Sequence, residues 1–297
     1  MEGLQWDYAL WAMSRTLEAF FLNKARELNL PEKKAMHEIR NIIERFIISM
    51  MNCPEERFPH DQLAKEVQKN LGFKLNMTDI DKIFCKPPPN STEVPLWDGK
   101  KLTYRKFSLA IDPDEWQYFF DTAGLFETAG LYIRYHALFL QGQQWSVSEE
   151  VFQSLQIPKD HREQVEAFSS PFNSYFLRNG LKGKVMTMFE MDQIFGFSFS
   201  FFNFFPDKPI VAFVNPPFIE DVLQKAVTHC EKLCQRNPGT IAYIYVPNWS
   251  DSPYYVSLKK SPFLKKFILL NKKTFPVITP TNKIDSPVEI IIAILAS

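Results

Sequence analysis

The chain has 297 residues, 45% of them apolar, so it is long enough to bury the core of one large or two ordinary domains. Lysine plus arginine and aspartate plus glutamate each number 34, which gives a formal net charge of zero. A global basic field for nucleic acid is therefore excluded, and a polyanionic partner would have to be met by a local basic patch.

The chain shows no pattern of a targeting or membrane segment. Its N-terminus carries charges from Glu2 onward, which is typical of neither a signal nor a transit peptide. The longest aromatic stretch, residues 195–214, is interrupted by charges and prolines before it could span a bilayer. We expect no membrane partner and a soluble intracellular protein, nuclear or cytoplasmic.

The four cysteines, Cys53, Cys85, Cys230 and Cys234, are few and scattered, which favours reduced thiols. A helix would place Cys230 and Cys234 on one face, but a third and a fourth ligand at zinc spacing are missing. The sequence therefore predicts no metal site.

The first part of the chain is predicted to be mostly helical. Residues 4–28 and 32–51 form two helices, the second with apolar residues at three- and four-residue steps. A third helix covers 59–73 and stops near Gly72, before the proline-rich breaker segment 85–101. Residues 101–111 alternate weakly, as in a short strand pair, and residues 112–140 return to helical spacing.

Beyond this point apolar strands alternate with a helix. Strand-like segments are expected at 164–172, 197–204, 210–214, 240–247, 262–271 and 288–295, and a helix at 218–237. This alternation predicts a mostly parallel, doubly wound sheet with helices on both faces and ligands at the carboxyl ends of its strands. We expect a helical domain over residues 1–128 and an α/β domain over 129–297.

The strand 210–214 runs directly into Asn215-Pro216-Pro217-Phe218. Two prolines cannot donate to a sheet, so the strand ends here, where a doubly wound sheet binds ligands. The Asn215 side-chain oxygen and the Pro216 carbonyl are two acceptors for the exocyclic amine of adenine, and the Phe218 ring offers a face for stacking. This chemistry suits transfer of a methyl group from S-adenosylmethionine, although a proline-rich turn is the competing interpretation.

A second motif, Ser170-Pro171-Phe172-Asn173, ends the strand at 164–172. Glu190 and Asp192 follow about twenty residues later, the spacing at which an acidic side chain reaches a ribose hydroxyl in dinucleotide folds. No glycine-rich loop is present, and Gly196 is one of three glycines nearby. An ordinary turn would give the same residues.

Five segments in order, "RYHALF", "FSSPFNSYF", "DQIFGF", "FVNPPFIEDVL" and "YVPNW", resemble the catalytic region of the phosphorylated CTD-interacting factor family, over about residues 130–297. The resemblance implies a Rossmann-like class I methyltransferase core after a mostly α-helical N-terminal domain. It implies S-adenosylmethionine-dependent N6-methylation of the 2′-O-methyladenosine next to the cap of mRNA.

By this resemblance Asn215, Pro216, Pro217 and Phe218 hold the target adenine. The residues expected at the cofactor are Ser170, Pro171, Asn173, Asp192 and Gly196. The expected partner is capped mRNA that begins with adenosine. Animal members carry a WW domain that binds the phosphorylated RNA polymerase II tail, and we expect none in this chain, so polymerase binding is in doubt.

Candidates for cap binding follow from charge and aromaticity. A methylated guanine favours an aromatic face with an acidic neighbour, for which Trp249 and Glu220 are candidates, although Trp249 also suits a core or an interface. For the triphosphate we consider Arg134, which a structural salt bridge would also explain. Six lysines, which also suit a solvated face, complete the set: Lys259, Lys260, Lys265, Lys266, Lys272 and Lys273.

Two alternatives remain open at this stage. An adenine N6-methyltransferase acting on internal RNA or on DNA would keep the same motif and differ in the surface that receives the strand. A catalytically inactive cap- or RNA-binding homologue would keep only the fold, but it would not need two acceptors aimed at an amine.

Overall fold

The computed structural model describes residues 2–52, 58–76, 78, 92–139, 146–155, 157–158, 160–270, 277–278, 283–284, 286 and 288–297. The residues outside these ranges include Cys53, Lys272, Lys273 and the first part of the proline-rich segment, residues 85–91, with Cys85. The chain divides into two compact units, Met1–Gln141 and Gly142–Ser297. Across the described ranges, every helix is too short or too polar to cross a membrane.

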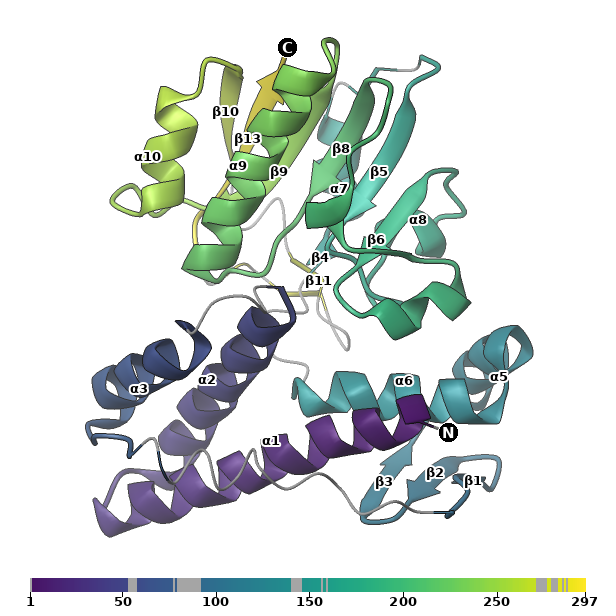
Figure 1. Cartoon of the computed structure of the whole chain (residues 1–297), viewed down its shortest axis with the longest axis vertical. Helices are drawn as coiled ribbons and strands as arrows, with labels where there is room; N and C mark the ends of the chain where they lie inside the picture. Colours follow the sequence, from purple (N-terminus) through teal and green to yellow (C-terminus); the bar gives the residue numbers. More distant parts are fainter. Residues whose placement is uncertain are drawn as a thin grey trace. The chain divides into compact units, whose positions relative to one another are not determined.

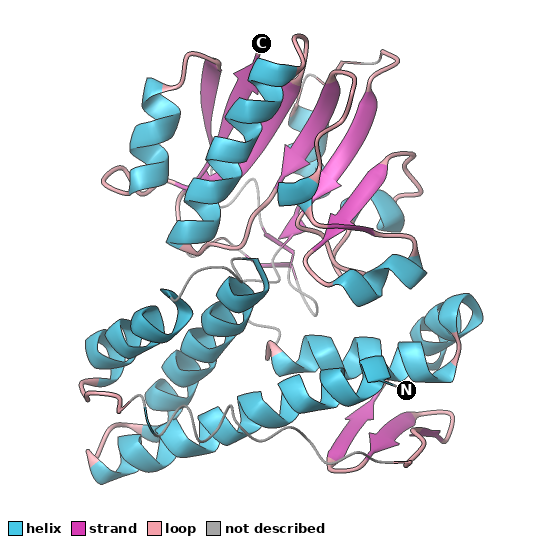
Figure 2. Cartoon of the chain, viewed as in Figure 1, coloured by secondary structure: helices cyan, strands magenta, loops and turns pink. Residues whose placement is uncertain are grey.

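The first unit is mostly helical, as predicted (Figures 1 and 2). Its helices are α1 (Glu2–Glu27), α2 (Glu32–Asn52), α3 (Phe58–Leu71), α5 (Pro113–Ala123) and α6 (Leu125–Ala137). A small antiparallel sheet contains β1 (Leu96–Trp97), β2 (Lys101–Tyr104) and β3 (Phe107–Ala110). The three N-terminal helices and the strand pair at 101–111 are thus confirmed.

Local sequence explains where these helices begin and end. The Asp112 carboxylate accepts hydrogen bonds from the backbone N–H of Asp114 and Glu115, and Pro113 occupies the first helical position of α5. Helix α3 ends before Gly72, whose φ of 77° is a conformation that glycine adopts without strain.

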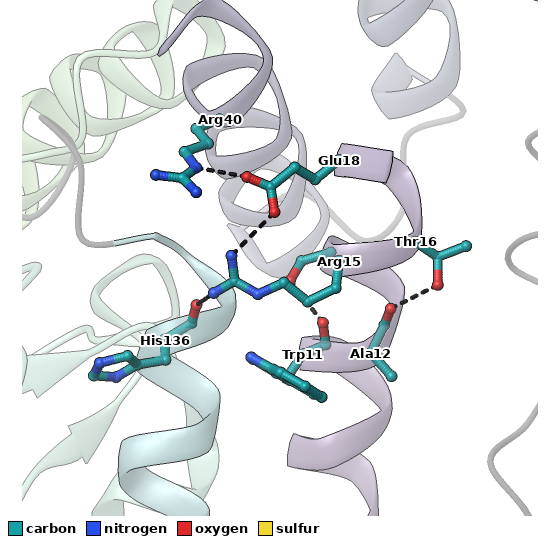
Figure 3. A network of polar contacts seen from close by, with 8 residues as sticks. Trp11, Ala12, Arg15, Thr16, Glu18, Arg40 and His136 are labelled. Carbon is teal, nitrogen blue, oxygen red and sulfur yellow. Dashed lines mark hydrogen bonds and ion pairs between the residues drawn. The ribbon is translucent and has the colours of Figure 1, made fainter. Parts of the chain in front are cut away.

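Polar contacts join three helices of the first unit (Figure 3). Arg15 of α1 donates to the His136 carbonyl of α6 at 2.9 Å and to the Glu18 carboxylate at 3.3 Å. Glu18 also accepts from Arg40 of α2 at 2.6 Å. Because α6 packs along α1, it belongs to the first unit, and the division follows Gln141, whereas the sequence analysis expected it at residue 128.

The second unit contains a mixed sheet with the strand order β10-β13-β9-β8-β5-β6-β7. Its strands are β5 (Glu163–Ala167), β6 (Lys184–Thr187), β7 (Ser198–Phe199), β8 (Ile210–Val214), β9 (Ile241–Pro247), β10 (Leu264–Leu270) and β13 (Ile290–Ala296). The five strands from β9 to β7 are parallel to their neighbours, and β13 pairs antiparallel with both β9 and β10. A separate three-stranded sheet joins β4 (Ser146–Val147), β11 (Val277–Ile278) and β12 (Lys283–Ile284).

Helices cover both faces of the large sheet. On one face, visible in Figure 1, α9 (Glu220–Arg236) and α10 (Pro253–Lys260) bury an aliphatic core that includes Val214, Ile244 and Leu223. On the other face, α7 (Glu149–Ser154) and α8 (Tyr175–Arg178) contribute rings to an aromatic cluster. In this cluster Phe152 stacks on Tyr175 at 3.8 Å and packs against Phe213 of β8 at 5.1 Å.

Two strand predictions differ from the structure. Only Ser198–Phe199 of the expected strand 197–204 pairs with the sheet, because the chain then turns into the 3-10 helix η3 (Phe201–Asn203) and buries Phe201 against His229 of α9. Strand β6, which the sequence analysis did not assign, pairs with β5. The phenylalanine-rich alternation therefore reflects packing onto a helix more than membership of the sheet.

Candidate active site

The carboxyl ends of β5 and β8 meet where the strand order reverses. Strand β6 lies on one side of β5 and β8 on the other, and Ala167 is directly opposite Val214. The turn that begins at Phe168 and the motif that begins at Asn215 therefore start next to each other. In open α/β sheets this switch point is the place where ligands bind.

The turn after β5 is tight and strained. Phe168 has a φ of 62°, a left-handed conformation that costs energy for a residue with a bulky side chain. The Asn173 side-chain oxygen accepts a hydrogen bond from the Ser170 N–H at 2.6 Å, which closes the turn. The Ser170 hydroxyl is buried without a partner in the described structure.

A buried carboxylate holds this turn in place. Glu166 of β5 is 7% exposed and accepts three hydrogen bonds: from the Ser174 hydroxyl at 2.6 Å, the Tyr175 N–H at 2.7 Å and the Phe176 N–H at 2.9 Å. These bonds satisfy the charge that burial would otherwise penalise. Glu166 thereby ties the beginning of α8 to the end of β5.

The Asn215-Pro216-Pro217-Phe218 segment connects β8 to α9. The Pro217 carbonyl accepts from the Ile219 N–H at 2.7 Å, and both prolines are buried, so the backbone is fixed before the helix begins at Glu220. The Phe218 ring packs nearly parallel to the Tyr245 ring of β9, with centroids 6.3 Å apart and an interplanar angle of 24°.

A cavity opens at the switch point, on the face of the sheet that carries the aromatic cluster. Its lining comes from β4 and α7, from the ends of β5, β8 and β9, and from Ile292 of β13. The lining residues are Ser146, Val147, Val151, Phe152, Leu155, Glu166, Phe168, Ser169, Asn173, Phe213, Val214, Asn215, Tyr243, Tyr245 and Ile292. The enclosed space is about 30 Å³, so a ligand as large as a nucleoside would have to displace some of the surrounding rings.

Two further residues expected at the cofactor lie after β6. Asp192, in the 3-10 helix η2 (Glu190–Phe195), is fully buried and accepts from the Thr187 hydroxyl at 2.7 Å. Gly196 ends η2 with a φ of 88° and has no atom close to the position of a Cβ. Gly196 is thus required by the turn, and Asp192 is joined to the end of β6.

The two candidates for the cap follow β8 and β9 in the chain, Glu220 after the Asn215–Phe218 motif and Trp249 two residues after β9. Glu220 is exposed in the first turn of α9, and Trp249 is 37% exposed. The Trp249 ring packs edge-on against Tyr254 at 6.4 Å, and Glu220 contributes to raising the pKa of Tyr254, mainly a result of burial, to about 12. Trp249 therefore contacts Tyr254, and both candidates keep accessible groups.

Four described lysines form an exposed group at the edge of the sheet. Lys259 and Lys260 end α10, and Lys265 and Lys266 lie on the edge strand β10. The Lys259 ammonium lies over the Phe267 ring, 4.6 Å from its centroid. Two strands, β13 and β9, separate these lysines from the motif strand β8.

Arg134 has a structural role that differs from the expected contact with phosphate. It lies in α6 of the first unit, is 1% exposed, and donates to both carboxylate oxygens of Asp7 at 2.8 Å. A phosphate would have to displace a buried carboxylate, which is unfavourable because Asp7 would then be unpaired. The ion pair with Asp7 therefore favours the alternative, a structural salt bridge.

Two residues of this region escaped the sequence analysis. Glu166 is an acidic residue in a strand that is otherwise buried at its carboxyl end, and such a residue in a sequence indicates a buried polar contact. Tyr243 and Tyr245 are two residues apart, so both side chains lie on the same face of β9. This spacing does not indicate which other strand ends lie beside Tyr245. Burial raises the pKa of Tyr245, so its phenol stays protonated at neutral pH.

A family model described as "Phosphorylated CTD interacting factor 1 WW domain" matches residues 113–277, which is more than half of the chain. The matched range runs from α5 to β11 and includes both the turn after β5 and the Asn215–Phe218 motif. Its description names a WW domain, which is at odds with the expectation that the chain has none. The match agrees with the family resemblance of the sequence motifs, and the chain belongs to the phosphorylated CTD interacting factor 1 family.

Proposed function

We propose that the chain is an S-adenosylmethionine-dependent methyltransferase that modifies N6 of the 2′-O-methyladenosine next to the cap of mRNA. The observation that carries this proposal is the position of Asn215 at the carboxyl end of β8, beside the turn after β5. The strand order, in which the antiparallel strand β13 lies between β9 and the edge strand β10, supports a Rossmann-like class I methyltransferase core. Family membership supports the same activity.

The residues at the cavity and in the turns after β5 and β6 have the chemical character that a bound S-adenosylmethionine requires. Phe168 and Phe213 supply apolar walls, and the Ser170 hydroxyl is a buried group without a partner in the described structure. Asn173 lines the cavity, and Asp192, in η2 after the neighbouring strand β6, carries a carboxylate of the kind that binds a ribose hydroxyl. When bound, the cofactor would supply an electrophilic methyl group whose bond to sulfur breaks as the bond to nitrogen forms.

The motif would act on the adenine amine. The Asn215 side-chain oxygen and the Pro216 carbonyl would each accept one N–H, which pulls the nitrogen toward a pyramidal geometry and frees its lone pair. Both contacts strengthen as positive charge develops on the nitrogen, so they stabilise the transition state more than the ground state. The amine then loses one proton to water, and no titrating side chain is required.

The substrate would enter as an unpaired nucleotide. The first transcribed base is not part of a duplex, so its insertion does not require base pairs to open. The Trp249 ring and the Glu220 carboxylate are our candidates for the positively charged 7-methylguanine, because both remain accessible beside the motif. The exposed lysines of α10 and β10 are candidates for longer RNA contacts.

The deciding experiment is transfer of labelled methyl groups to short RNAs that differ only in the cap and the first nucleotide. We expect methylation of capped RNA that begins with 2′-O-methyladenosine, and little on uncapped RNA or RNA that begins with guanosine. Equal rates with and without a cap would favour an internal-RNA enzyme, and activity on DNA would favour a DNA enzyme. Binding of capped RNA without transfer would indicate an inactive homologue.

A further inference from the structure

Tyr245 carries a buried hydroxyl with no partner in the described structure. The residue is 4% exposed and lines the cavity at the switch point, yet its oxygen makes no hydrogen bond to any residue that the structure describes. Two other buried tyrosines differ: Tyr254 donates to the Pro247 carbonyl and Tyr132 to the Glu115 carboxylate, each at 2.7 Å. Native proteins rarely leave buried polar groups unpaired, so the Tyr245 hydroxyl requires an explanation.

Packing alone does not explain the hydroxyl. The Tyr245 ring packs against Phe218, and phenylalanine would make the same contact without burying an unpaired oxygen. A buried hydroxyl without a partner destabilises the protein until a ligand supplies that partner. Sites built to bind a specific polar group use unpaired atoms of this kind.

The position of Tyr245 identifies the ligand. On the parallel strands β8 and β9, Val214 is directly opposite Ile244, so Asn215 and Tyr245 are the next residues on adjacent strands. Both line the cavity, and Phe218 lies against the Tyr245 ring. A purine held by Asn215 through its amine would therefore lie within the region that the hydroxyl borders.

We propose that the Tyr245 hydroxyl donates a hydrogen bond to a ring nitrogen of the adenine whose amine Asn215 binds. This inference rests on the proposed function and makes Tyr245 a substrate-binding residue. The ring nitrogens N1 and N7 flank the amine and carry lone pairs but no hydrogen, so they are acceptors for a phenol. Burial raises the pKa of Tyr245, so the donor proton is present at neutral pH.

The test compares Tyr245→Phe with the wild type in the capped-RNA assay. We expect kcat/KM for RNA to fall by about tenfold or more, because the variant leaves a base nitrogen unpaired. The affinity for S-adenosylhomocysteine in calorimetry should stay within twofold, and the Tm should be unchanged or higher. Tyr132→Phe is the matched control: its hydroxyl has a partner, so the Tm should fall and kcat/KM should stay within twofold.

Base analogues make the test specific to the proposed bond. RNAs with 1-deaza- or 7-deaza-adenine as the first base each lack one of the two acceptors. For the analogue that lacks the partner of Tyr245, wild type and Tyr245→Phe should have equal kcat/KM. If neither analogue removes the difference between the two proteins, the hydroxyl does not bind the base and the proposal is wrong.

The remaining outcomes are separable. An inactive wild type would refute the proposed function itself. An active wild type with Tyr245→Phe inside twofold would refute only the present inference. If Tyr245→Phe binds S-adenosylhomocysteine more weakly but keeps its KM for RNA, the hydroxyl binds the cofactor. If its Tm falls as much as that of Tyr132→Phe, the hydroxyl has a partner within the protein. Either result overturns the proposal.

Discussion

Replacing Glu166 by glutamine tests whether a buried carboxylate holds the turn that forms the cavity. Glu166 accepts three hydrogen bonds between 2.6 and 2.9 Å, two at Oε2 and one at Oε1. In Glu166→Gln one oxygen remains and can keep at most two of these donors. The new NH2 group cannot accept a hydrogen bond, so the donor that faces it becomes buried and unpaired.

The expected loss of stability follows from these bonds. Hydrogen bonds to a charged group contribute roughly 1.5–3 kcal/mol, and bonds between neutral groups about 0.5–1.5 kcal/mol. The loss of one bond and of the charge in two others amounts to about 3.5–6 kcal/mol. For a unit of this size that corresponds to a decrease in Tm of about 7–24 °C.

The assay combines thermal unfolding with hydrogen exchange measured on peptides that cover β5 and α8. Exchange reports local opening, which matters because the two compact units need not unfold together. Glu163→Gln is the matched control on the same strand: its side chain is 47% exposed and lies 3.7 Å from the Lys184 ammonium, so we expect a loss below about 1 kcal/mol. If Glu166→Gln were no more damaging than this control, the carboxylate would not hold the turn.

Three further outcomes are expected. Asn215→Ala should lower turnover about a hundredfold, in line with the roughly 2.7–4 kcal/mol lost when one transition-state hydrogen bond is removed. The Tm should change little, and near-full activity would show that the motif is only a structural turn. Burial lowers the pKa of His229 to about 4, below its value in the unfolded chain, so stability should fall by on the order of 3 kcal/mol from pH 7 to pH 4. In urea unfolding at both pH values His229→Gln should lose clearly less, and an equal loss would contradict this assignment. In thermal unfolding, Gly130→Ala should destabilise the first unit by about 2 kcal/mol or more, because a Cβ would collide with the Asp7 carboxylate. The control Gly3→Ala, which has open space around its Cβ position, should be neutral or stabilising.

The sequence alone determined the local elements whose signal lies within a few residues. Strand β8 has the predicted bounds, because a run of five buried residues meets two prolines that cannot continue it. Helix α2 follows from apolar residues at three- and four-residue steps, and α1 and α9 lie where the sequence predicts helices at 4–28 and 218–237. The candidate chemistry of Asn215 also came from local sequence, since strand, amide and prolines are contiguous.

Only the tertiary structure decided which of these elements meet. The pairing of β5 with β8 brings the strained turn at Phe168 beside Asn215, although more than forty residues separate them in the chain. In the first unit, the packing of α6 along α1 brings Arg134 to Asp7, a partner 127 residues away that no spacing rule identifies. Side-chain periodicity records which face of an element is buried but not the element that covers it, so the unpaired hydroxyl of Tyr245 became visible only once the strands were assembled.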